Sequence, residues 1–135
     1  MNNVSFGITQ QIALAQRVGI LTADQTQQVT IQVLGNPTAQ LSGIRVLDVS
    51  TGVWYNVYPE GQPAYCNPGA GNLVIAYGVN NVGVIGGNLY GKITDSGGAL
   101  LHSGVAWVAP GGTAFWEPVF NMPAEDLNLT IEVGH

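Results

Sequence analysis

The sequence predicts an all-β fold, a sandwich of antiparallel strands that follows an extended N-terminal arm. From residue 27 onward, short runs with β-like alternation recur about every 10 to 15 residues, which is typical of sandwiches and barrels. Turns separate these runs, and the sequence contains 19 Gly and 7 Pro, the residue types that favour turns. Hydrophobic residues make up 46 % of the 135 positions, enough for the core of one domain without disulfides or metal.

The N-terminal segment, residues 4 to 20, carries a sustained alternating pattern. Large apolar residues occupy only its even-numbered positions, and they are Val4, Phe6, Ile8, Ile12, Leu14, Val18 and Ile20. As one straight strand the segment would span roughly 55 Å, far more than the ~20 Å of an ordinary strand. We therefore expect an arm over residues 1–22, distinct from a sandwich over residues 23–135.

Three arrangements are open for this arm. It leaves its own subunit and completes a neighbour's sheet, as donated strands do. It bends or splits and stays in its own sheet. A short helix over residues 9–18 is the third alternative, because TQQIALAQRV contains good helix formers. We prefer the first, and it predicts that the apolar row of the arm is an interface between subunits.

The first strands of the sandwich lie before residue 60. Val29, Ile31 and Val33 alternate with polar residues, and Gly35-Asn36-Pro37 then turns the chain. Two further alternating runs, Ile44 to Val46 and Val53 to Val57, flank a turn at Ser50-Thr51-Gly52.

The remaining strands follow a break at Asn67 to Gly71. Leu73 to Val79 is apolar on both faces, which predicts a central strand. Three runs follow it, over residues 89–94, 100–108 and 113–120. In the last run, residues 127–133, the odd positions are apolar and should face the core, while Asn128, Thr130 and Glu132 should face outward.

The second half also resembles a known family. The residues that carry the resemblance are Tyr77-Gly78-Val79-Asn80-Asn81-Val82-Gly83, then Gly87, Leu89, Ile93, Asp95, Gly98 and Leu101, then Val108-Ala109-Pro110-Gly111-Gly112-Thr113, Phe115 and Trp116. This series is similar to the CARDB-like immunoglobulin-like domains of bacterial and archaeal surface proteins, over residues 72–135. The resemblance implies an immunoglobulin-like sandwich and a surface role, and it implies no catalytic residues.

Charge is the unusual feature of the composition. Only 8 % of the residues are Asp, Glu, Lys or Arg, against about 25 % in ordinary domains. The three basic residues, Arg17, Arg45 and Lys92, are too few to neutralise nucleic-acid phosphates. A surface of neutral polar groups suits ordered assemblies, because burying such groups costs less than burying charges.

The sequence contains no apolar run of about 20 residues, and we expect no membrane span. Its N-terminus lacks the basic start and apolar block of a secretory signal, so we expect that a signal was removed or never used. Asn3 and Asn128 begin glycosylation triplets, which favour an exterior location.

No catalytic or metal constellation is recognisable, and we expect no enzyme and no cofactor. The two histidines, His102 and His135, and one cysteine, Cys66, are too few ligands for a transition metal. Ser103 is adjacent to His102 on a strand, so the two side chains should face opposite ways. Cys66 has no internal disulfide partner, and we expect a small buried side chain. The acids Asp48, Asp95 and Glu125-Asp126 are expected to cap turns rather than bind calcium.

One strand combines aromatic and amide side chains on one face, through Trp54, Asn56 and Tyr58. This face is a candidate sugar-binding surface, a subunit interface or half of the core.

The prediction for function is therefore a non-enzymatic, self-assembling structural protein, either a virion surface or capsid protein or an extracellular filament subunit. Its expected partners are other copies of itself and other virion or surface proteins, without nucleic acid. The alternatives are a monomeric adhesion or carbohydrate-binding module on a cell surface or phage fibre, and a chaperone or inhibitor domain.

Overall fold

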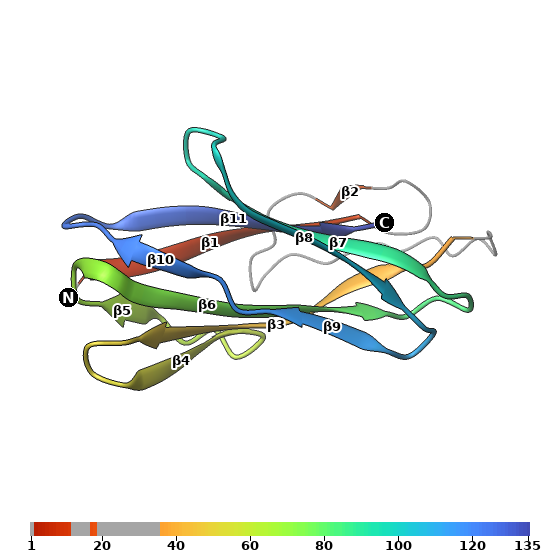
Figure 1. Cartoon of the computed structure of the whole chain (residues 1–135), viewed down its shortest axis with the longest axis horizontal. Helices are drawn as coiled ribbons and strands as arrows, with labels where there is room; N and C mark the ends of the chain where they lie inside the picture. The colour runs from red at the N-terminus through yellow and green to blue at the C-terminus, as the bar shows by residue number, and fades with distance from the viewer. Residues whose placement is uncertain (1, 12–16, 19–35) are drawn as a thin grey trace.

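The computed structural model describes residues 2–11, 17–18 and 36–135, and it confirms the predicted β-sandwich. Eleven strands form two sheets that face each other, with no helix in the described residues (Figure 1). No helix able to cross a bilayer occurs in this part of the chain.

The first sheet, here called sheet A, has the strand order β2-β1-β11-β7-β8, and β5 also pairs with β1. Its strands are β1 (Asn2–Gln11), β2 (Arg17–Val18), β5 (Ala64–Cys66), β7 (Gly87–Asp95), β8 (Leu100–Val108) and β11 (Leu127–Gly134). The pairs β7–β8, β7–β11, β1–β5 and β1–β2 are antiparallel, whereas β1 and β11 run parallel.

The second sheet, sheet B, has the order β10-β6-β3-β4. β9 also pairs with β6, along its later part from Tyr77 to Asn80. Its strands are β3 (Ala39–Asp48), β4 (Val53–Tyr58), β6 (Gly69–Asn81), β9 (Thr113–Trp116) and β10 (Val119–Met122). The run predicted over residues 113–120 is thus two strands, separated at Glu117-Pro118, because proline has no N–H for the ladder.

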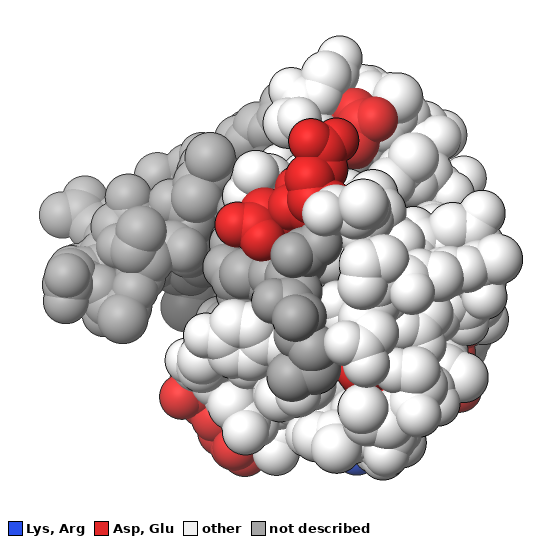
Figure 2. Space-filling view, turned by 90° about the vertical axis from the view of Figure 1, so that its left-hand side faces the viewer, with Lys and Arg blue, Asp and Glu red and all other residues white. Residues whose placement is uncertain are grey.

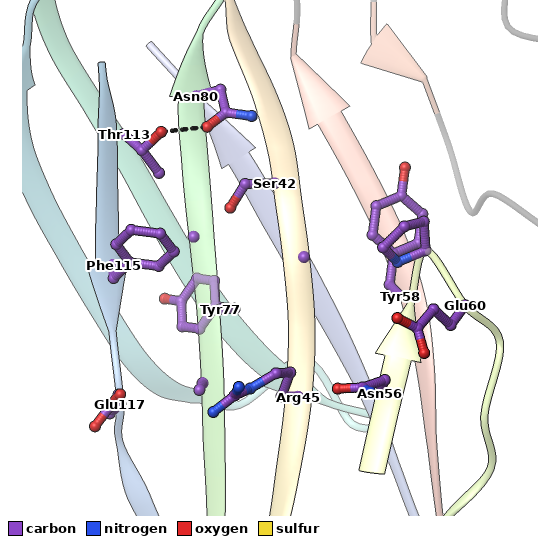
Figure 3. Close-up of a pocket in the computed structure, with 14 residues that line it drawn as sticks. Ser42, Arg45, Asn56, Tyr58, Glu60, Tyr77, Asn80, Thr113, Phe115 and Glu117 are labelled. Carbon is purple, nitrogen blue, oxygen red and sulfur yellow. Dashed lines mark hydrogen bonds between the residues drawn. The ribbon is translucent and has the colours of Figure 1, made fainter. Parts of the chain in front are cut away.

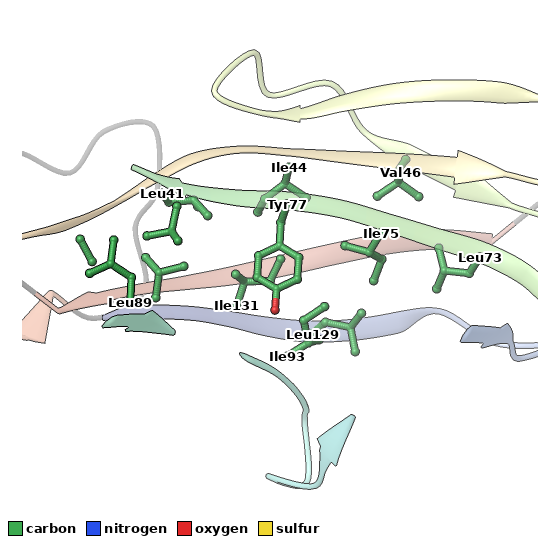
Figure 4. Packing of buried hydrophobic residues seen from close by; sticks show 14 of the residues in the cluster. Leu41, Ile44, Val46, Leu73, Ile75, Tyr77, Leu89, Ile93, Leu129 and Ile131 are labelled. Carbon is green, nitrogen blue, oxygen red and sulfur yellow. The ribbon is translucent and has the colours of Figure 1, made fainter. Parts of the chain in front are cut away.

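The core lies between the sheets and follows the predicted alternation. In β6, the central strand of sheet B, Leu73, Ile75, Tyr77 and Val79 are fully buried. They face side chains of β7 and β11 across the sandwich (Figure 4). The labelled core residues are Leu41, Ile44, Val46, Leu73, Ile75, Tyr77, Leu89, Ile93, Leu129 and Ile131.

The last strand departs from its predicted pattern at one position. Asn128 is exposed, and Leu129, Ile131 and Val133 are buried, as expected. Glu132 alternates to the outer face but is only 5 % exposed. Its carboxylate lies 3.0 Å from the Lys92 ammonium and accepts a hydrogen bond from the Tyr90 hydroxyl, so the strand β7 beside it supplies polar partners instead of water.

Part of the strand order matches that of an immunoglobulin sandwich, whereas β4, which pairs with the outer edge of β3, has no counterpart there. β3, β6 and β9–β10 correspond to strands A, B and E of one immunoglobulin sheet, and β7, β8 and β11 to strands C, C′ and F of the other. In that fold a seventh strand, G, pairs with F on the side away from C. Here β1 occupies this position. The predicted strand at residues 29–33 lies outside the described residues.

Candidate functional site

The first candidate is the position along the edge of β11, here called the slot, because the N-terminal strand β1 fills it. The register places Val4 opposite Leu127, Phe6 opposite Leu129 and Ile8 opposite Ile131. The other edge of β1 pairs with β5 and with β2. β1 is therefore an interior strand of sheet A, and without it the edge of β11 would expose a row of unpaired N–H and C=O groups.

The chain that joins β1 to the sandwich is long. β2 pairs with β1, so the connection from this strand pair to Ala39 consists of residues 19 to 38, 20 positions. At a maximum of about 3.3 Å per residue, a connection of 20 residues reaches roughly 66 Å, farther than the width of one sandwich. A connection of this length is long enough for β1 to reach the same position on a second copy of the chain placed beside the first.

The predicted arm residues fall partly on described strands. Val4, Phe6 and Ile8 belong to β1, and Val18 belongs to β2. Ile12, Leu14 and Ile20 lie outside the described residues, as does the segment between the two strands. Because Gln10 pairs with Val18, the alternating segment is split into two antiparallel strands and is not one straight strand. This corresponds to the second of the three arrangements, in which the segment bends or splits and stays in its own sheet. The predicted contact of this arm with another copy of the chain stays a prediction.

The free edge of sheet A is the second candidate. β8 pairs only with β7 among the described strands. Its sequence, LLHSGVAWV, has no Asp, Glu, Lys or Arg and no proline, the residues that normally protect an edge strand. On its outer face Val105 is 69 % exposed and Trp107 66 %. A long, uncharged and apolar edge of this kind favours pairing with another chain.

The end of the sandwich shown in Figure 2 agrees with the sparse charge of the sequence. Most of its described surface belongs to uncharged residues, and the charges that are visible are mainly acidic (Figure 2).

The third candidate is a groove on the outer face of sheet B. It has a volume of about 520 Å³ and lies over β3 and β6, between β4 on one side and β9 on the other (Figure 3). Two of the three residues predicted for a sugar or interface face, Asn56 and Tyr58, line it. Trp54 instead lies under the guanidinium of Arg45, 4.4 Å from its ring centre, and orients that side chain beside the groove.

Sequence reasoning missed most of this groove. Ser42, Arg45, Phe115 and Glu117 come from β3, β9 and the residue after β9, so no local pattern joins them. One local signal was present. Leu41 and Ile44 are both buried with two residues between them, which breaks strict alternation and marks a β-bulge at Ser42.

The residues considered for catalysis have structural contacts. His102 faces the interior, where its Nδ1 lies 2.8 Å from the Tyr77 hydroxyl oxygen and its ring meets Tyr77 edge to face. Burial lowers the pKa of His102 below its ordinary value of 6.5. Ser103, the next residue on the strand, is exposed, so the two side chains face opposite ways as predicted.

Two of the acids considered for calcium, Asp48 and Asp95, cap turns through hydrogen bonds. Asp48 accepts hydrogen bonds from the backbone and hydroxyl of Ser50 and from the Thr51 hydroxyl. Burial opposes its ionisation, but these bonds outweigh burial, and its pKa lies below the ordinary 3.8. Asp95 likewise accepts from the amides of Gly97 and Ala99. The described residues contain no group of three metal-ligating side chains.

Cys66 is buried on β5, directly beside the slot that β1 fills. Its register partner on β1 is Asn2, and its Sγ lies 3.9 Å from the carbonyl oxygen of Leu47. Burial, with the nearby Asp48 carboxylate, raises the pKa of this thiol to about 11. The glycosylation candidate Asn128 is exposed, and Asn3 lies on β1.

Comparison with protein-family models, with curated proteins and with solved structures finds no match. The resemblance to CARDB-like domains therefore rests on the residues quoted above and stays a prediction.

Proposed function

We propose that this protein is a self-assembling structural subunit, of an extracellular filament or of a virion surface, in which neighbouring copies exchange β1. The observation that carries the proposal is the strand beside β11. In an immunoglobulin-like sandwich the strand after F turns back and pairs antiparallel, whereas here a strand from the N-terminal side lies parallel in that position.

The slot can be filled by either source of β1 with the same contacts. A β1 from the same chain and a β1 from a neighbour present identical residues to β11 and β5. The free-energy difference between the two arrangements therefore depends on the connection and on protein concentration, as in domain swapping. Donation to the next copy in one direction does not close on itself and produces a fibre.

Two further features support assembly. The uncharged edge of β8 offers a second surface for contact between copies. Ordinary monomers protect such an edge strand with charged residues or proline. With 8 % charged residues, little charge has to be desolvated when copies pack together. A subunit of this kind acts by packing, which is consistent with a non-enzymatic role.

A single substitution tests strand exchange, because Cys66 lies opposite Asn2 in the antiparallel pair. Opposite positions bring Cβ atoms to roughly 4.5–5.5 Å, near the separation that a disulfide requires. The variant Asn2→Cys is concentrated, oxidised at alkaline pH to ionise the Cys66 thiol, and run on a non-reducing gel. Exchange predicts a ladder of multimers joined between positions 2 and 66, established by peptide mapping, and filaments or shells by electron microscopy.

The matched control is Asn3→Cys, whose register partner is Tyr65 and not a cysteine. It should give no bond to position 66. If Asn2→Cys yields only an internally bonded monomer at every concentration, β1 belongs to its own subunit, and the alternative of a monomeric adhesion or carbohydrate-binding module takes the place of this proposal.

A further inference from the structure

The groove on sheet B has a floor made of small residues. Gly43 of β3 and Ala76 and Gly78 of β6 lie at its bottom, so the sheet is hollowed where larger side chains would fill it. Gly78 is essential to this shape. A Cβ there would lie 2.4 Å from Ser42 Oγ and 2.7 Å from Phe115 Cδ1, so any other residue would push both side chains away.

Aromatic side chains stand on both walls of the groove. Phe115, from β9, is 71 % exposed, although an apolar ring of this size is normally buried. Tyr58, at the end of β4, lies on the opposite wall (Figure 3). Tyr58 also packs partly against the core, so Phe115 is the ring that offers a flat apolar face to a ring-shaped ligand.

Polar groups that form hydrogen bonds surround the same space. The bulge in β3 turns Ser42 toward the groove, and its hydroxyl, covered from solvent, has no hydrogen-bond partner among the described residues. Leaving a buried hydroxyl unpaired costs about 1–3 kcal/mol, so a ligand group that pairs with this hydroxyl is favoured. At the far end Thr113 donates to Asn80 Oδ1, which leaves the amide NH₂ of Asn80 to donate to a ligand.

The charges of the groove restrict the ligand. Arg45, whose guanidinium lies over the Trp54 ring, supplies the cation, and Glu60 and Glu117 supply two carboxylates. The balance is one negative charge, which disfavours an anionic ligand, whereas carboxylates and a guanidinium together bond well to neutral hydroxyl groups.

We propose that this groove binds a short neutral saccharide, with one sugar ring stacked on Phe115 and its hydroxyls bonded by Ser42, Arg45 and Glu117. A volume of about 520 Å³ falls within the usual range of small-molecule sites. A ligand that displaces the Phe115 ring from above Gly78 gains the Ser42 hydroxyl as a partner. The site goes beyond strand exchange and does not depend on it, because β3, β4, β6 and β9 belong to the body of the sandwich.

Titration calorimetry with the full chain tests the proposal. The neutral probes are maltotetraose, cellotetraose, mannotriose and diacetylchitobiose; sialyllactose is the anionic probe and a capped neutral tetrapeptide the non-sugar probe. We expect at least one neutral saccharide to bind. Phe115→Ala should then weaken its affinity about 10-fold, the upper range for a lost aromatic contact.

Two further variants separate binding from folding. Ser42→Ala should weaken affinity by about 2- to 10-fold while leaving thermal stability unchanged or higher, because the hydroxyl is unpaired in the free protein. Val119→Ala, which removes an exposed apolar side chain on the neighbouring β10 outside the groove, should leave affinity unchanged. The proposal is wrong if no neutral saccharide binds at millimolar concentration, if only sialyllactose or the peptide binds, or if Phe115→Ala binds as tightly as the wild type.

Discussion

Replacing Gly104 with alanine tests how the two sheets pack against each other. Gly104 lies on β8 of sheet A, facing the interior, and the indole of Trp116 on β9 of sheet B covers it. The same indole packs beside Tyr77, with ring centres 5.3 Å apart. A single methyl group at position 104 therefore enters an aromatic cluster that connects the two sheets.

The size of the effect follows from the distances. A Cβ on residue 104 would lie 2.3 Å from Trp116 Nε1 and 2.7 Å from Cε2, well inside contact distance. Insertion of an extra methylene into a packed core costs about 1–3 kcal/mol. Alanine also restricts the unfolded chain, which offsets about 0.4–1 kcal/mol. We expect Gly104→Ala to lower the free energy of unfolding by about 1–2 kcal/mol.

Urea denaturation measures this change, with Gly97→Ala as the control. Gly97 lies in the exposed turn after β7, and a Cβ there meets only Asp95 Oδ1 at 3.4 Å. The control should stay within about 0.5 kcal/mol of the wild type. Because the three atoms nearest to the added Cβ belong to the pyrrole half of the indole, Trp116→Phe should restore part of the loss in the double variant. Wild-type stability of Gly104→Ala would refute the placement of Trp116 over β8.

Three further predictions concern single side chains. Because the pKa of His102 is lowered in the folded protein, the free energy of unfolding falls as pH decreases below about 6.5, where the unfolded chain takes up the proton first. The urea midpoint of the variant His102→Gln should therefore be nearly flat between pH 7.5 and 5.5. The lowered pKa of Asp48 has the same sign lower on the scale: its contribution is present above about 3.8 and lost as pH falls through the folded value, and Asp48→Ala at pH 7 should cost about 1.5–3 kcal/mol in the same assay. Cys66, buried and with a pKa of about 11, should resist a thiol reagent at neutral pH in the folded protein and react after denaturation; fast reaction under native conditions would show that β5 is open.

Local patterns were sufficient to predict most of the sandwich. Alternation in residues 44–46, 53–57 and 127–133 and the doubly apolar run of residues 73–79 each became a strand. Such runs have one or two faces to bury and few other ways to bury them. The turn at Ser50-Thr51-Gly52 was equally local, since Gly52 has a φ of 73° and the preceding Asp48 bonds the turn.

The candidate sites were less predictable, because each depends on strands far apart in the sequence. Trp54, Asn56 and Tyr58 were identified as one face, but the groove also needed Phe115 from β9 and the bulge at Ser42. The free edge of β8 is a matter of strand order, which no local pattern encodes.

The sequence by itself determined the fold class, the charge-poor surface and the alternating N-terminal segment, because composition and period-2 patterning are properties of neighbouring residues. Only the tertiary structure decided that β1 lies parallel to β11, in the position that strand G occupies in an immunoglobulin fold. It also decided that a hollow opens above Gly78. Both depend on which strands become neighbours across a sheet, and strand pairing is settled by the burial of the whole core at once rather than by any one segment.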